Sequence, residues 1–82
     1  MQYQIEFLPS ALEQLRVLSK DVRRLIGGKL DRALHDLAGD IKKLKGFKNK
    51  YRLRTGNYRV LFELEGACLV VYDVGDRKDI YE

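Results

Sequence analysis

The residues with the clearest chemical potential in this 82-residue chain are basic, and they are concentrated in one segment. Between Ile41 and Phe62 there are eight lysines and arginines and no acid, whereas the rest of the chain carries eight basic and twelve acidic residues. Such an asymmetry focuses positive potential on one patch, as in proteins that bind polyanions. The alternative is a solvated, lysine-rich loop. The eight are Lys42, Lys43, Lys45, Lys48, Lys50, Arg52, Arg54 and Arg59.

The elements that must position these cations are predicted to be strands. Two strand-like runs, residues 50–54 and 58–64, flank a tight turn in which Gly56 and Asn57 can supply positive φ values. A third run, residues 68–74, is apolar on both faces and is expected to be central in the sheet. An antiparallel meander of three strands is therefore predicted.

Side chains alternate between the two faces of a strand, which sorts the residues of the first two runs. Tyr51 and Leu53 should point toward a helix-covered face. Lys50, Arg52 and Arg59 are then expected to share the opposite face, which we call the open face and which should have no lid. The inward set of the second run is Tyr58, Val60, Phe62 and Leu64, with Leu61 pointing outward beside Arg59.

The N-terminal half is predicted to form a strand followed by two helices. Polar and apolar residues alternate over residues 3–8, as in a strand. Ser10 and Glu13 have the spacing of a capping box, which predicts the start of a helix. Asp21 is the expected cap of a second helix, whose apolar residues follow the helical period from 22 to 37. Together with the meander, this predicts an α+β domain with a helix hairpin on one face of an antiparallel sheet.

Two details of the chain invite a structural interpretation. Gly27 and Gly28 lie inside the second helical pattern, where each costs about 1 kcal/mol relative to alanine. We interpret them as allowing the two helices to pack closely. The linker of residues 41–49 is expected to be held against the core by Leu44 and Phe47.

Composition excludes several classes of protein. No apolar run approaches the ~18 residues of a membrane span, and the N-terminus lacks the pattern of a signal peptide. The single Cys68 excludes an internal disulfide and a cysteine-rich zinc site, and no acidic cluster suggests a Mg²⁺ or Ca²⁺ site. His35, the one histidine, lies in a helical pattern without a catalytic partner. We expect one domain over residues 1–82, without metal or cofactor, in the cytoplasm.

Two stretches of the chain resemble the RelE/ParE superfamily of bacterial toxins. They are LKGFKNKYRLRTGNYRVLFEL, residues 44–64, and VYDVGDRKDIY, residues 71–81. The resemblance covers nearly the whole chain and is greatest to the RelE branch, whose members cut messenger RNA on the ribosome. It implies an α+β fold like that of microbial ribonucleases. It also implies a type II toxin that inhibits translation as a metal-independent mRNA endoribonuclease, with an acidic RelB-like antitoxin, the ribosome and mRNA as partners.

The resemblance further implies a role for individual residues in attack of a ribose 2′-OH on the adjacent phosphate. Lys50 matches the first lysine of the family's basic set, and Arg59 matches the arginine that steadies the phosphate. Arg77 matches the arginine that protonates the leaving 5′ oxygen, and Tyr81 matches the tyrosine that stacks on the base being cut. The remaining cations are expected to bind RNA or the ribosome: Lys42, Lys43, Lys45, Lys48 and Arg54.

Two positions depart from the family pattern. Arg52 stands where well-studied members have a lysine assigned as general base, and a guanidinium is a poor base at neutral pH. Either Lys50 takes that role, or Arg52 only stabilises charge. Asp76 stands beside Arg77 where many relatives carry histidine or lysine, and its charge would neutralise part of the site.

Two other functions remain open on the sequence. One is a ParE-like toxin that acts on DNA gyrase without cutting RNA. The other is an inactive basic binding module, which Arg52 and Asp76 favour. The combination of Lys50, Arg59, Arg77 and Tyr81 favours the nuclease.

Overall fold

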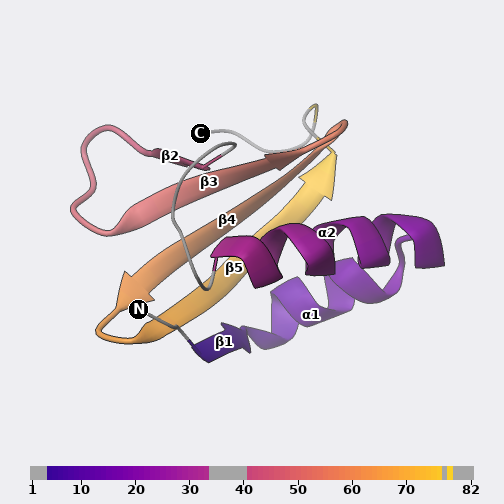
Figure 1. Ribbon diagram of the computed structural model, residues 1–82, viewed down its shortest axis with the longest axis horizontal. Helices are drawn as coiled ribbons and strands as arrows, with labels where there is room; N and C mark the ends of the chain where they lie inside the picture. The colour runs from indigo at the N-terminus through magenta and orange to yellow at the C-terminus, as the bar shows by residue number, and fades with distance from the viewer. Residues whose placement is uncertain (1–3, 34–40, 77, 79–82) are drawn as a thin grey trace.

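A five-stranded sheet with two helices on one face forms the architecture (Figure 1). The computed structural model describes residues 4–33, 41–76 and 78, so Arg77, Tyr81 and His35 lie outside the described residues. The predicted α+β class is confirmed. In chain order the elements are β1 (Gln4–Phe7), α1 (Pro9–Arg16), α2 (Lys20–Ala33), β2 (Ile41–Lys43), β3 (Lys50–Thr55), β4 (Tyr58–Glu65) and β5 (Cys68–Asp76).

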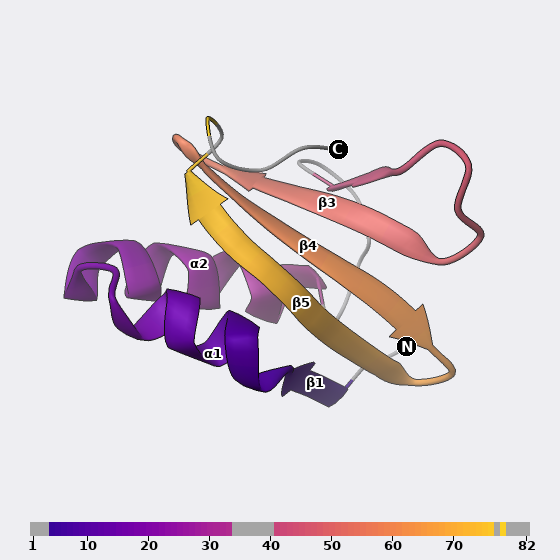
Figure 2. The ribbon, with the colours of Figure 1, turned by 180° about the vertical axis from the view of Figure 1, so that it is seen from behind.

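The strands are ordered β1-β5-β4-β3-β2, with antiparallel pairing from β5 to β2. The meander of β3, β4 and β5 is confirmed, and β5 has a neighbour on each side, although the middle strand is β4. Two pairings were not expected from the sequence. β1 lies parallel to β5 (Figure 2), and residues 41–43 form the edge strand β2 (Figure 1) instead of a plain linker.

Both helices begin earlier than the sequence patterns predicted. Leu8 is the N-cap of α1 and makes no side-chain capping bond, so the predicted capping box is wrong. Pro9 occupies the first turn instead, where a missing N–H costs nothing. At α2, the Oγ of Ser19 accepts a hydrogen bond from the backbone N–H of Val22 at 3.3 Å. Ser19, and not Asp21, therefore caps this helix.

The main core lies between the helix pair and the inward face of the sheet. Ile26 and Leu30 of α2 are buried there with Leu53 and Phe62 of the sheet. The rings of Tyr51 and Phe62 stack, with centroids 5.5 Å apart. The predicted inward residues of β4 are confirmed: Val60 and Phe62 are fully buried, and Tyr58 and Leu64 pack against the same cluster.

A second, smaller cluster lies outside this core. Leu44 and Leu61 are buried there, 8% and 4% exposed, and Tyr72 packs against them. Leu61 thus points away from the main core, as predicted, but Leu44 covers it, so the open face is not entirely without a lid. Phe47 was expected to help hold the linker, and that expectation is wrong because its side chain is 48% exposed.

A bulge in β5 changes which face its residues point to. Leu61 pairs with Asp73 and Phe62 with Val71, so Tyr72 has no partner in β4. Gln14 of α1 supports the bulge: its Nε2 donates to Asp73 Oδ1 at 2.9 Å, and its Oε1 accepts from the backbone N–H of Val74 at 2.8 Å. One helix side chain therefore satisfies two polar groups at the bulge.

Some of the glycines are required by a turn, and others are not. Gly56 has a φ of 60° in the β3–β4 turn, as predicted, whereas Asn57 does not take a positive φ. Gly27 and Gly28 are exposed, and a Cβ atom added to either would meet nothing within 4 Å. The interpretation that they allow close packing of the helices is therefore wrong.

Candidate nucleic-acid interface

Basic residues of three adjacent strands lie in rows across the open face. The register places Lys42 opposite Arg52, and Arg54 opposite Arg59. Arg52 is also paired with Leu61, whose side chain points away from the main core, so these cations share that face. Like charges directly opposite one another destabilise a sheet. The two pairs therefore concentrate positive charge on this face, which a polyanion bound from outside would neutralise.

Lys50 has a different environment from the other cations. It lies opposite Glu63 of β4, and its Nζ is 3.6 Å from Glu63 Oε1, with both side chains about 30% exposed. The same Nζ lies 4.6 Å from the ring centroid of Phe47 and 5.2 Å from that of Tyr72. The expectation of a basic row without a neighbouring acid is therefore wrong at Lys50.

The sequence contained the information needed to find this pair. A two-residue turn at Gly56 and Asn57 makes Thr55 face Tyr58, and counting back along both strands then brings Lys50 to Glu63. Glu63 lies one residue beyond the acid-free window, so a count along the chain missed an acid that is adjacent across the sheet.

Tyr72 is the polar member of the second cluster. Its burial, followed by the nearby charges of Glu63 and Asp73, raises the pKa of its phenol. The hydroxyl therefore stays neutral in the physiological range and remains able to donate a hydrogen bond. Its ring lies beside Lys50, which gives the open face an aromatic surface as well as cations.

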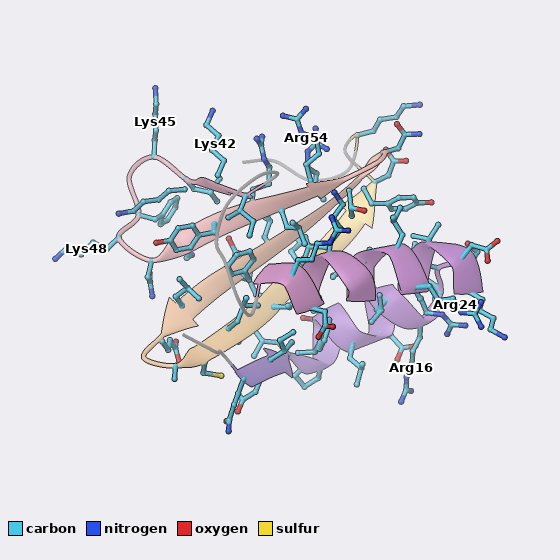
Figure 3. All side chains as sticks on the ribbon, in the orientation of Figure 1. Arg16, Arg24, Lys42, Lys45, Lys48 and Arg54 are labelled. Atoms are coloured by element: carbon cyan, nitrogen blue, oxygen red, sulfur yellow. The ribbon has the colours of Figure 1, made fainter. Side chains whose placement is uncertain are left out.

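The remaining cations differ in how far they reach into solvent. Arg52 and Arg59 are half-buried in the middle of the sheet, and Arg59 Nη1 donates to the Tyr58 carbonyl oxygen at 3.5 Å. Lys43 is exposed on β2. Figure 3 shows the peripheral cations extending away from the helix layer: Lys42, Lys45, Lys48 and Arg54.

A second basic region, not predicted from the sequence, lies on α2. Arg24, Lys29 and Arg32 line a shallow cavity of about 210 Å³ together with Leu25 and Gly28. Arg24 extends from the helix layer, well away from the cations of the open face (Figure 3). Residues 20–32 contain five basic residues and two acids, so the region is less conspicuous in a charge count than the acid-free window. The helical spacing of these cations was the available signal, because positions four and eight apart share one side of a helix.

Other kinds of site find no support in the described part of the chain. Residues 4–33, 41–76 and 78 contain no group of three side chains that could hold a metal ion. Within the same ranges, neither helix has the length and apolar character needed to cross a membrane. Burial, followed by the charge of Glu6, raises the pKa of the Cys68 thiol, which favours its protonated form at neutral pH.

The structure brings together three of the five residues predicted to be catalytic. The open face carries Lys50, Arg52 and Arg59. They belong to three residue pairs of β3 and β4 that follow one another on this face. Their chemical roles stay predictions. Arg77 and Tyr81 follow β5 and lie outside the described residues.

Comparisons with known proteins agree with this fold. Residues 5–81 match the model of a family described as the ParE toxin of the type II toxin–antitoxin system parDE. Toxin RelE3 of Methanocaldococcus jannaschii is 48% identical over 50 residues, which are 61% of this chain and 57% of that protein. The match thus spans little more than half the length of this curated relative.

Two solved structures resemble nearly the whole molecule. A chain of the RelB–RelE antitoxin–toxin complex from Methanococcus jannaschii is 31% identical with a TM-score of 0.78, covering 93% of this chain and 94% of that one. The isolated Escherichia coli RelE toxin is 26% identical with a TM-score of 0.81, covering 90% and 83% respectively. The chain therefore belongs to the ParE toxin family of type II toxin–antitoxin systems, within the RelE/ParE superfamily, and its fold is that of the RelE branch.

Proposed function

We propose that this protein is a toxin that cuts messenger RNA on the ribosome and so inhibits translation. The observation that carries this proposal is the pairing of like charges across the open face, Lys42 with Arg52 and Arg54 with Arg59. A face on which cations lie opposite one another is suited to a phosphate backbone, which neutralises several cations at once. The solved RelE relatives support the same class of activity.

The proposed chemistry is metal-independent attack by the ribose 2′ oxygen on the adjacent phosphorus, with breakage of the bond to the 5′ oxygen. Arg59 would steady the phosphate, and Arg77 would give a proton to the leaving 5′ oxygen. Tyr81 would stack on the base being cut. Fixed cations can stabilise the extra negative charge of the transition state in place of a metal ion.

The environment of Lys50 supports a purely electrostatic role for it. Its ion pair with Glu63 and its contacts with the Phe47 and Tyr72 rings are those of an ammonium group. Of the two alternatives left by the sequence, we therefore propose the one in which Arg52 only stabilises charge, and we extend the same role to Lys50. The 2′ proton would then pass to solvent, and the reaction would be slower than in relatives that have a lysine base.

We also infer that an acidic, RelB-like antitoxin controls the protein. The RelE relatives from Methanococcus jannaschii and Escherichia coli were solved as complexes with RelB antitoxins. On this chain the helix layer exposes three leucines, Leu8, Leu12 and Leu25, which are 43%, 40% and 46% exposed. Together with the basic cavity beside Leu25, they suit a partner with apolar and acidic side chains.

One experiment separates the nuclease from its rival. The ParE name of the matching family favours a toxin that acts on DNA gyrase. We expect that inducing the protein in bacteria will produce new 5′ ends in a translated message, detected by primer extension, and will leave gyrase supercoiling unchanged. Arg59→Gln should abolish the new ends, and Arg24→Gln, which removes a cation from the helix layer, should not. Inhibited supercoiling with an intact message would reverse the assignment.

A further inference from the structure

Phe47 exposes an aromatic ring in the middle of the basic loop between β2 and β3. Its side chain is 48% exposed, although large apolar side chains are usually buried. It belongs to neither of the two clusters of buried apolar residues. The exposed Lys45 and Lys48 lie on either side of it in the loop. The ring therefore contributes little to the core and stands among cations at the surface.

The ring lies against Lys50, which is itself paired with Glu63 of β4. Lys50 Nζ lies over the Phe47 ring at 4.6 Å from its centroid, and it is 3.6 Å from Glu63 Oε1. One side of the ring is thus occupied by the ammonium group, and the exposed remainder faces solvent. The ring stands directly beside a cation that we have proposed to act on the RNA phosphate.

We propose that Phe47 is a stacking platform for a nucleobase of single-stranded RNA. This inference rests on the proposed function, because it requires RNA on the open face. Aromatic rings set among cations are the means by which proteins hold single strands, since phosphates meet the cations while bases stack on the rings. A nucleotide whose phosphate approaches Lys50 would bring its base to Phe47, at the β2–β3 loop end of the open face.

The absence of tryptophan from the chain permits a direct test. The variant Phe47→Trp would carry a single fluorescent indole at the platform. We expect its emission to be quenched saturably by a short 2′-O-methyl RNA oligonucleotide at low salt, since this RNA lacks the attacking hydroxyl. Val17→Trp is the matched control: this residue is 77% exposed between the helices, and its emission should not change. Binding is measured separately, from the anisotropy of a labelled oligonucleotide.

Removing the bases distinguishes stacking from a structural role. An abasic strand with the same phosphates should bind without quenching Phe47→Trp. If Phe47 only held Lys50 in place, Phe47→Leu would weaken abasic and normal strands equally. If Phe47 stacks, Phe47→Leu should weaken only the strand with bases, by about 5- to 150-fold, equivalent to about 1–3 kcal/mol. Phe47→Tyr keeps the aromatic ring and should bind like the unmodified protein.

A second measurement uses ribosome-bound message. Phe47→Leu should raise the protein concentration needed for half-maximal cleavage and leave the saturated rate nearly unchanged, and Phe47→Tyr should restore the normal concentration. The proposal is overturned if the oligonucleotide binds without base-dependent quenching of Phe47→Trp. It is also overturned if Phe47→Leu cleaves with an unchanged half-maximal concentration, whether or not the free oligonucleotide binds.

The two proposals can fail separately. If bases quench Phe47→Trp but the protein cuts no message, the stacking proposal is retained and the nuclease proposal is rejected. If cleavage is normal and Phe47→Leu does not change it, the stacking proposal is rejected and the nuclease proposal is retained. Loss of binding only to an acidic antitoxin peptide in Phe47→Leu would identify Phe47 as a protein contact instead, which also overturns the platform.

Discussion

Lys50 and Glu63 face each other across β3 and β4, with Nζ and Oε1 3.6 Å apart. The pair connects the loop that carries Phe47 to the middle strand of the sheet. A partly exposed pair of this kind contributes about 0.2–1 kcal/mol to stability at most. Its greater effect is on the open face, where Glu63 cancels one positive charge within the proposed RNA site.

Replacing that acid should strengthen RNA binding. Glu63→Gln preserves the shape of the side chain and leaves Lys50 available to a phosphate. We expect tighter RNA binding. The slope of the logarithm of the binding constant against the logarithm of the salt concentration should be steeper by roughly 0.7, the value for one added contact to a single strand. Anisotropy titrations at several salt concentrations measure this slope. Glu13→Gln on α1 removes the same charge from the helix layer and should leave the slope unchanged. An unchanged slope in Glu63→Gln would mean that Glu63 does not compete with the phosphates for Lys50.

Arg52→Lys should keep or raise the rate of cleavage. A lysine surrounded by other cations can lose its proton and act as a general base, whereas a guanidinium cannot. Single-turnover cleavage of a ribosome-bound message measures the chemical step. Arg54→Lys, at an exposed position of the same strand, is the control and should have little effect. A loss of more than ~100-fold in Arg52→Lys would show that the forked geometry of arginine is itself required.

Gly27→Ala and Gly28→Ala should each stabilise the fold by about 1 kcal/mol. Both glycines lie inside α2, and a Cβ at either position meets nothing within 4 Å. The gain comes from higher helix propensity and from a less flexible unfolded chain. Urea denaturation followed by circular dichroism measures the change. Gly56→Ala should do the opposite, because Gly56 has a φ of 60°. A loss of stability in either helix variant would contradict the packing that we describe.

Gln14→Leu should destabilise the protein by about 1–3 kcal/mol, because it leaves the backbone N–H of Val74 and the carboxylate of Asp73 without their helix partner. The neighbouring Glu13→Leu, at an exposed position, is the control for a new leucine on α1. Thermal unfolding of the two variants measures the difference. Equal melting temperatures would indicate that water replaces Gln14 at the bulge.

Variants at Arg77 and Tyr81 should separate effects on the chemical step from effects on RNA binding. Arg77→Ala should slow the single-turnover step by ~10²–10³ and change binding little, because its proposed contact forms with the leaving oxygen. Tyr81→Phe should be mild, whereas Tyr81→Ala should weaken binding by about 1–3 kcal/mol through lost stacking. Circular dichroism checks that the variants fold. Full toxicity of the double alanine variant would show that growth arrest does not come from RNA cleavage, and the gyrase hypothesis would then be preferred.

Local rules determined much of the open face. Alternation along residues 50–64 placed Tyr51 and Leu53 in the core and the intervening cations outside, and Gly56 provided the turn. These predictions are confirmed because they depend only on neighbouring residues: side chains alternate with a period of two along a strand, and the turn is formed by residues that are adjacent in the sequence. The same turn fixes the register that pairs Lys50 with Glu63, so this contact was also encoded locally, although a count of charges along the chain overlooked it.

Only the tertiary structure decided the features that depend on distant partners. The parallel pairing of β1 with β5 joins segments at opposite ends of the described chain, and the bulge at Tyr72 is held by Gln14, about 60 positions away. Ser19 and Asp21 are both acceptable helix caps by type, and the choice depended on how α2 meets the turn that precedes it. Such features follow from burying one apolar face while satisfying every backbone group, a condition on the whole chain that no short segment contains.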